Sequence, residues 1–450
     1  MTPLIPRFLA LLLVLVPASA LAQEPLQVDI SRGHLDPMPI AIPAFIDEGG
    51  TEGRGADIAG VVAADLESSG LFTTVDEAAF IEEIQDFNLR PRFQDWRVIN
   101  ADALLIGQLT RQGDGRLLVG FRLWDTRLQE QLVGLQFVTA PENWRRVAHR
   151  VADAVYERLT GESGYFDTRI VYVSESIGPR GEPLRRLAYM DQDGANPSFL
   201  TNRSYWALLP NYSPSAQQIT YVSFLDGQAT TYVYDLESGR QEALFASGGT
   251  GLARIDPDGQ SLSARFSPDG EQLAVSIELQ AGHDIHLFDL RSRSLRRLTE
   301  HPADDVEPSF APDGERIVFS SSRSGGSQLY VMDANGGNVS RISFGEGRYT
   351  APVWSPRGDL IAFVKQHNGQ FSLGVVAADG SGEERILYQG YYVDTPAWSP
   401  NGRVILFTRG ERGREGTEYE IWSVDLAGFN LRRMPINGQS SDPAWSPLIE

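Results

Sequence analysis

One short motif that occurs six times constrains the fold of this chain more than any other feature. Each copy has an aromatic residue, a small residue and proline, and most copies continue with a polar residue and glycine. The copies begin at Tyr212, Phe266, Phe310, Trp354, Trp398 and Trp445, at intervals of 54, 44, 44, 44 and 47 residues. A period near 44 residues is typical of the four-stranded blades of a β-propeller.

The number of blades follows from the second strand of each repeat, which is rich in Ile and Val. Such strands occur at residues 170–173, 219–222, 273–277, 317–319, 361–364 and 404–407. The first has no aromatic-Ser-Pro segment before it, and the final segment, Ala444–Pro447, has no second strand after it. We therefore predict an all-β six-bladed propeller over residues 163–450, closed by the C-terminal strand, since closure hides the sheet edges. The recurring aromatic ring is expected to fill the gap between neighbouring blades.

Residues 23–162 lack the repeat and alternate strand with helix signals, which predicts an α/β N-terminal domain. Residues 57–69 have the apolar spacing of an amphipathic helix. The continuous apolar run Leu104–Gly107 is expected of a central strand. Thr139–Glu142 has the pattern of a capping box before a second helix, which Gly161 would end.

The first 22 residues have the order of a secretory signal peptide. Arg7 provides the positive end, Leu9–Val16 the apolar stretch and Ala20–Ala22 a small-residue cleavage site. The apolar stretch is too short for a comfortable bilayer span, and no second run of membrane length follows. Because the chain contains no cysteine, we expect neither a lipid anchor nor disulfides, but release into a bacterial periplasm without membrane insertion.

Charge and motifs exclude several classes of function. The chain has 39 Lys plus Arg against 59 Asp plus Glu, and a net charge of −20 repels nucleic acid. It has no G-x-S-x-G elbow, no P-loop and no dinucleotide fingerprint in a strand-to-helix context. His283 and His286 would point to opposite faces of a strand, which makes them a poor metal clamp. We therefore predict no cofactor and no enzymatic activity.

Acidic residues next to strand-opening prolines are expected to line one mouth of the propeller. They are Glu307, Asp394 and Asp442, which stand directly before or two residues before a proline. Two interpretations stay open for these residues. They are solvated loop acids, or those near Glu307 and Asp394 hold a hard cation such as calcium in the channel.

The loops before the inner strands also concentrate tyrosine and arginine, the usual anchor residues of protein interfaces. This composition predicts a docking face for another protein on the propeller. Together with the acids, its candidate residues are Arg203, Tyr205, Asp304, Asp305, Glu307, Arg348, Tyr349, Tyr391, Tyr392, Asp394 and Asp442.

Near the mature N-terminus, Leu26, Val28 and Ile30 alternate with polar residues at the period of a strand. One interpretation is an edge strand of the chain's own domain. The other is an extended arm that adds to the sheet of another protein, with Ser31–Gly33 as its hinge.

Four segments of the first domain, combined with the blades and the closing Trp-Ser-Pro, resemble the TolB family of the bacterial Tol-Pal system. The segments are Pro39–Phe45, Asp65–Phe72, Ala101–Gly107 and Phe121–Asp125. The resemblance implies a monomeric, non-enzymatic periplasmic adaptor that binds the outer-membrane lipoprotein Pal on one propeller face. It also implies that the N-terminal segment, here about residues 23–33, engages the C-terminal domain of the inner-membrane protein TolA. Such an adaptor keeps the envelope layers together during constriction at cell division.

One segment departs from the family pattern, and two other functions stay open. The loop between Phe245 and Phe266 is ten residues longer than its neighbours, where the family usually has a short polar loop on the partner face. The alternatives are a periplasmic hydrolase or lyase acting on peptide or glycan, with Glu307, Asp394 and Asp442 as its acids, and a scaffold without switching. The hypothesis for an adaptor is a switch in which the arm packs on its own domain or is released to TolA, with Pal biasing the choice.

Overall fold

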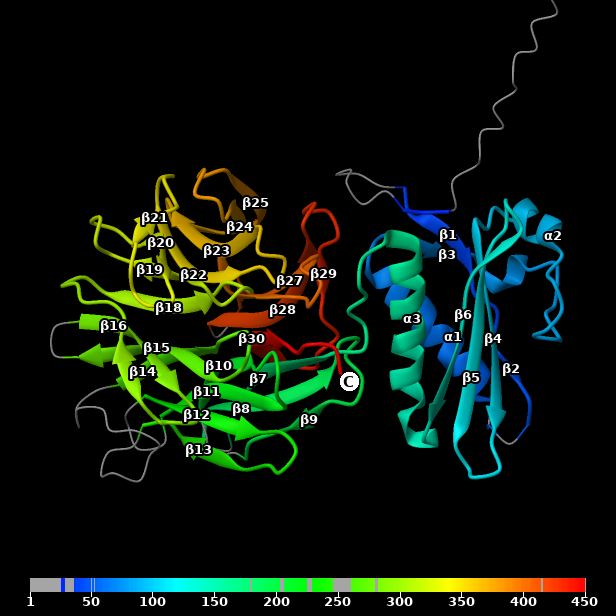
Figure 1. The fold of residues 1–450 in the computed structure, drawn as a ribbon, viewed down its shortest axis with the longest axis horizontal. Coiled ribbons are helices and arrows are strands. Elements are labelled where there is room, and N and C mark those ends of the chain that lie inside the picture. The colour runs from blue at the N-terminus through cyan, green and yellow to red at the C-terminus, as the bar shows by residue number, and fades with distance from the viewer. Residues whose placement is uncertain are drawn as a thin grey trace, which may run out of the picture.

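The computed structural model has two parts joined by a short linker (Figure 1). It describes residues 26–28, 36–49, 51, 53–178, 180–202, 206–224, 229–245, 260–279, 282–413 and 416–449. The predicted signal peptide, residue Ile30, the hinge Ser31–Gly33 and most of the long loop after Phe245 lie outside these ranges. None of the described helices is both long and apolar enough to cross a bilayer.

The N-terminal part is a mixed sheet with order β3-β1-β4-β5-β6, in which β2 also pairs with β4. Helices α1 and α3 cover the sheet face toward the propeller, and α2 lies on the far side (Figure 1). Its elements are β1 (Met38–Ala41), β2 (Ile46–Asp47), α1 (Arg54–Ser68), β3 (Phe72–Thr74), the 3₁₀ turn Glu77–Ala79, α2 (Phe93–Val98), β4 (Ala103–Arg111), β5 (Leu117–Asp125), β6 (Glu130–Thr139), the 3₁₀ turn Pro141–Asn143 and α3 (Trp144–Thr160).

Apolar patterning explains these elements. The stripe of Ile58, Val62 and Leu66 on α1 packs against α3 and the sheet, as the spacing predicts. Strand β4 is central and has side chains buried on both faces, which confirms the prediction from its continuous apolar run. The expected capping box is wrong. Thr139 is instead the last residue of β6, paired with Leu117, and α3 begins only at Trp144 without a side-chain cap.

The propeller consists of six four-stranded sheets, as predicted. Five follow chain order: β10–β13 (Ala207–Tyr212, Gln218–Ser223, Thr230–Asp235, Gln241–Ala243), β14–β17 (Gln260–Phe266, Gln272–Leu279, Gly282–Asp289, Leu295–Arg297), β18–β21 (Asp305–Phe310, Arg316–Ser321, Gln328–Asp333, Ser340–Arg341), β22–β25 (Arg348–Trp354, Leu360–His367, Gln370–Ala377, Glu384–Gly390) and β26–β29 (Tyr392–Trp398, Val404–Arg412, Thr417–Asp425, Arg432–Arg433). The sixth combines β30 (Gln439–Trp445) with β7 (Arg169–Ile177), β8 (Pro183–Asp191) and β9 (Ser198–Phe199).

The C-terminal strand closes the ring, because β30 pairs antiparallel with β7 at the start of the propeller. The aromatic residue of each repeat packs between blades, as expected. Trp354, for example, lies in one apolar cluster with Ala311 and Val318 of the preceding blade. The predicted boundary after residue 162 falls in the linker of residues 161–168, between the end of α3 and the start of β7.

Candidate functional site

In five of the six inner strands, the residue directly before a proline has a left-handed backbone. These residues are Leu209, Glu307, Ala351, Thr395 and Asp442, with φ between 49° and 56°. The ladder register shifts at each of them, as at a β-bulge. Because this conformation costs roughly 1–2 kcal/mol for a residue other than glycine, its recurrence at one blade position indicates that the geometry has a role.

Side chains around the channel bind the backbone N–H groups of these residues. The N–H of Ala351 donates to Glu307 Oε2 of the preceding blade at 2.6 Å. The N–H of Leu209 donates to Asp442 Oδ2 at 3.2 Å, and the N–H of Asp442 donates to Thr408 Oγ1 at 2.9 Å. Two of the predicted acids thus connect neighbouring blades.

The channel is a cavity of about 570 Å³ lined by the inner strands of all six blades. Glu307, Asp394 and Asp442 line it together with Arg265, whose Nη1 donates to Asn211 Oδ1 at 2.8 Å. Burial raises the pKa of Asp442 to about 6 and raises the pKa values of the other two acids. Burial also lowers the pKa of Arg265 to about 10. With three acids and one base, the channel suits a positively charged group better than an anion.

A cation near Glu307 and Asp394 remains a prediction. Within the described ranges, the only acidic and histidine side chains that bring three ligand atoms within 4.8 Å of one another are Asp65, His149 and Asp193. These three lie outside the channel, at the junction of the two domains.

The two ends of the channel have different surroundings. At one end, the Ser-Pro turns contact the linker: Asn401 Nδ2 donates to the carbonyl of Ser163 at 2.9 Å, and Arg357 Nη1 donates to Glu162 Oε1 at 2.7 Å. At the other end are the loops before the inner strands. We call this end the open face and define it by residues 303–305, 347–349, 391–392 and 439–440.

Several predicted docking residues are exposed on the open face. Tyr391 is 45% exposed, and the Arg412 guanidinium lies 5.3 Å from the centre of its ring. Arg348 is also exposed. Asp304 is exposed and pairs with His283, with 2.8 Å between Oδ1 and Nδ1. These side chains form a mixed aromatic and charged surface.

Three other predicted residues lie beneath this surface. Asp305 is buried and pairs with Arg323 at 2.7 Å. Tyr349 is buried and donates its hydroxyl to Glu384 Oε2 at 2.6 Å. Tyr392 is half-buried and donates its hydroxyl to a channel carboxylate at 2.8 Å. These side chains support the loops of the open face from below.

An aromatic pair that the sequence reasoning did not single out lies near the same end of the propeller. Trp206 is 42% exposed, and its ring centre is 5.7 Å from that of Phe224. The Arg185 guanidinium lies 5.7 Å from the Trp206 ring. The available signal was the neighbouring aromatic Tyr205, which, like Arg203, lies outside the described residues.

The described part of the N-terminal segment contacts its own domain. Val28 is buried in the domain core, and its N–H donates to the carbonyl of Leu159 at 2.7 Å. Leu26 is half-buried against the same core. Ile30, the third residue of the predicted arm, is not among the described residues. The segment thus reaches the C-terminal end of α3.

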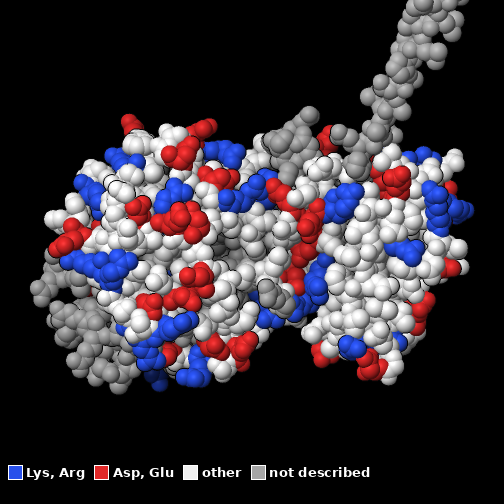
Figure 2. Space-filling view, viewed as in Figure 1, with Lys and Arg blue, Asp and Glu red and all other residues white. Residues whose placement is uncertain are grey.

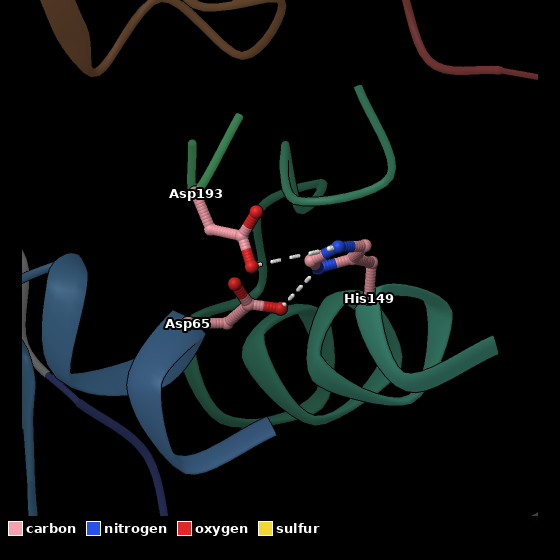
Figure 3. A group of neighbouring side chains, drawn as sticks. All are labelled: Asp65, His149 and Asp193. Atoms are coloured by element: carbon pink, nitrogen blue, oxygen red, sulfur yellow. Dashed lines mark hydrogen bonds and ion pairs between the residues drawn. The ribbon is translucent and has the colours of Figure 1, made fainter. Parts of the chain in front are cut away.

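A buried polar cluster joins the two domains (Figure 3). Asp65 on α1 and His149 on α3 are paired at 2.6 Å, and Asp193 approaches from the turn after β8. On the surface around this region, acidic side chains gather along the line where the domains meet, with Lys and Arg side chains beside them (Figure 2). No sequence motif predicted this cluster, because its members are far apart in the chain.

Comparison with known families gives matches over most of the chain. The family model described as the TolB amino-terminal domain matches residues 26–132. The model described as the TolB beta propeller domain matches residues 156–449.

A solved structure resembles this chain over nearly its full length. TolB from Acinetobacter baumannii is 26% identical, with a TM-score of 0.77, and the match covers 94% of this chain and 100% of that one. An oligogalacturonate lyase from Vibrio parahaemolyticus is 12% identical over 58% of this chain and 78% of its own, with a TM-score of 0.42 that carries no argument. From the two domain matches and the full-length likeness, we conclude that this chain belongs to the TolB family.

Proposed function

We propose that this protein is the periplasmic adaptor of a Tol-Pal system and binds the lipoprotein Pal through the open face. Membership of the TolB family supports a role in this system and favours a binding protein over an enzyme. The observation that carries the proposal is the pairing of exposed aromatic rings with arginines at Tyr391 and Trp206. Tyr, Trp and Arg are the residues that most often dominate the binding energy of protein interfaces.

The channel acids give little support to a hydrolase or lyase. Glu307 and Asp442 each accept a hydrogen bond from a backbone N–H of the neighbouring blade, and Asp394 accepts the hydroxyl of Tyr392. These contacts give the carboxyl groups a structural role. Together with family membership, they make an adaptor the preferred function.

Calorimetric titration of the mature protein with the soluble domain of Pal from the same organism tests this proposal. We expect saturable 1:1 binding. The single variants Tyr391→Ala and Trp206→Ala should each weaken the binding of Pal roughly thirtyfold, because losing one anchor residue costs about 2 kcal/mol of binding free energy. Phe429→Ala removes an exposed aromatic ring from the opposite end of the propeller and is the matched control. Full affinity in the double variant would move the docking site elsewhere, and no binding by a folded wild-type protein would reject the proposal.

We propose further that the N-terminal arm is exchanged between its own domain and TolA. Its described part is attached through one backbone hydrogen bond and two apolar side chains, so a few kcal/mol of differential binding is enough to shift it. This device would link Pal binding to TolA binding while the envelope constricts at division.

Deletion of residues 23–33 tests whether TolA and Pal bind to different parts of the protein. We expect the deleted protein to lose measurable affinity for the C-terminal domain of TolA and to keep its fold and its affinity for Pal. Circular dichroism checks the fold, and calorimetry measures both affinities. Unchanged TolA affinity in the deletion would rule out the arm as the TolA site.

A further inference from the structure

Helices α1 and α3 each contribute one residue to a buried ion pair that lies next to the propeller. Asp65 lies in the last turns of α1 and His149 in the first half of α3, and they are 1% and 2% exposed. The turn after β8 places Asp193 beside them (Figure 3). Gln192 of the same turn forms a hydrogen bond with Asp65. Two elements of one domain and one of the other thus meet at a single buried point.

The hydrogen bonds cross the domain boundary. Asp65 Oδ2 lies 2.6 Å from His149 Nδ1, and Asp65 Oδ1 accepts from Gln192 Nε2 of the propeller at 2.8 Å. On its other side, His149 Nε2 is buried without a hydrogen-bond partner and lies 4.0 Å from Asp193 Oδ2. Asp193 is also paired with Arg145. The imidazole therefore stands between two carboxylates that belong to different domains.

Acidic groups outnumber basic ones on the elements packed around His149. The charged and titratable side chains are Asp65 of α1, Arg145, Arg146, Arg150 and Asp153 of α3, Tyr165 and Asp167 of the linker, and Asp191 and Asp193 at the end of β8 and in the following turn. Burial by itself lowers the pKa of the imidazole. The charge and hydrogen bond of Asp65, with the charges of Asp193 and Asp191, outweigh burial and raise the pKa of His149 to about 9. The group is thus an imidazolium at neutral pH.

A proton fits the cluster better than a metal ion. Nδ1 of His149 is already bonded to Asp65, and Asp193 Oδ2 is shared with the Arg145 guanidinium. A metal at Nε2 would find one carboxylate and a positive charge beside it, whereas protein zinc sites use three or four ligands.

Further contacts concentrate on the same end of α1. Asn430 Nδ2 donates to the carbonyl of Ser68 at 2.8 Å, and Arg432 Nη1 donates to the carbonyl of Glu67 at 3.1 Å. These are C-terminal carbonyls of the helix, where donors and cations are favourable. The β28–β29 connection of one blade and the turn after β8 of another therefore both contact the last turns of α1.

We propose that His149 is a charged latch between the domains, and that its imidazolium, bound between Asp65 and Asp193, fixes their relative orientation. Loss of the proton leaves the buried carboxylate of Asp65 and the half-buried carboxylate of Asp193 facing each other across the junction, and the domains then reorient about the linker of residues 161–168. Since the pKa is raised, the contribution of the latch is complete below the ordinary value of 6.5 and is lost as the pH rises through about 9.

A distance measurement between spin labels on the two domains tests the latch in the full mature chain. The chain has no cysteine, so Gln136→Cys on β6 and Glu237→Cys after β12 give two unique and exposed labelling sites. We expect a narrow distance distribution at pH 7 that widens with a midpoint near pH 9. His149→Gln and Asp193→Asn should widen it already at pH 7, beyond the spread between replicate samples.

His286→Gln is the matched control, since this histidine is also buried but lies within one blade. It should leave the distribution narrow at pH 7. Circular dichroism of each variant shows whether both domains stay folded, and Asp193→Asn carries the test if His149→Gln does not fold. A narrow distribution at pH 7 in a folded His149→Gln or Asp193→Asn protein would overturn the proposal.

Two further measurements test whether His149 holds a proton or a metal ion. The imidazole resonance of His149, assigned by its absence in His149→Gln, should titrate above pH 8, and a midpoint below pH 7 would contradict the latch. Titration with zinc chloride at pH 7 should show no binding that depends on His149. If the wild-type protein binds zinc stoichiometrically and His149→Gln does not, the site holds a metal ion in place of the proton, and the proposal is overturned.

Discussion

At the scale of single residues, Asp442 combines a left-handed backbone, a half-buried carboxyl group and a hydrogen bond between blades. Its φ is 51°, and its carboxylate accepts the N–H of Leu209, which is itself left-handed. An acceptor at this point satisfies an N–H that would otherwise be buried without a partner. The acceptor matters more than the charge, because burial raises the pKa of Asp442 to about 6 and disfavours its ionised form.

Two substitutions at Asp442 separate the acceptor from the charge. Asp442→Asn keeps an oxygen for the Leu209 N–H and suits a left-handed backbone, so its thermal midpoint at pH 8 should equal or exceed that of the wild type. At pH 4, where the aspartate is protonated, the two proteins should agree. Asp442→Ala leaves the N–H unpaired and should cost about 1–3 kcal/mol at both pH values. Scanning calorimetry measures the midpoints, and equal midpoints for the two variants at pH 8 would contradict this role.

At the scale of elements, the repeats predicted the blades well because each blade carries its own turn chemistry and apolar strands. Closure by β30 followed from simple counting, and it is confirmed. The capping box at Thr139 failed because β6 extends through that residue and takes its backbone into the sheet. A local motif indicates which structure a segment prefers, but it does not show which neighbouring strand will pair with the same backbone.

The candidate site was harder to predict than the blades. Asp305 and Tyr349 lie within the first two residues of β18 and β22, whereas Asp304 and Tyr391 lie directly before β18 and β26. The first two are buried and the second two are exposed. Successive side chains point to opposite faces of a strand, so a shift of one residue along the chain exchanges a buried position for an exposed one. His149 is a further case, since a lone histidine on an amphipathic helix gives no sign of carboxylates that arrive from other elements.

At the scale of the whole molecule, three groups with raised pKa values make stability depend on pH in the same direction. Burial raises the pKa of Asp153 to about 7 and that of Asp442 to about 6, against an ordinary value of 3.8. The pKa of His149 is raised to about 9. A raised pKa in the folded state means that the folded protein binds more protons than the unfolded chain. The contribution of each group to the free energy of unfolding therefore falls as the pH rises from its ordinary pKa to its raised pKa.

The thermal midpoint of the whole protein should therefore be highest on the acid side of neutrality and fall steadily between pH 5 and pH 9. Exposed carboxylates with lowered pKa values, such as Asp269 and Asp304, act in the opposite sense only near and below 3.8. Calorimetric scans at constant ionic strength measure this trend. His149→Gln should flatten its upper part, between pH 7 and pH 9, and a midpoint that rises over this range in the wild type would contradict the assignment.

The pairing of β30 with β7 also has a consequence in time. A chain made from its N-terminus produces β7 before every other strand of the propeller and β30 after them, so the first blade lacks its inner strand until the other five blades have been made. Until residues 439–445 emerge, the inner edge of β7 has no partner within its own sheet, and unpaired edges invite association with other chains. The ring therefore becomes complete in a single late step that joins the two most distant parts of the propeller.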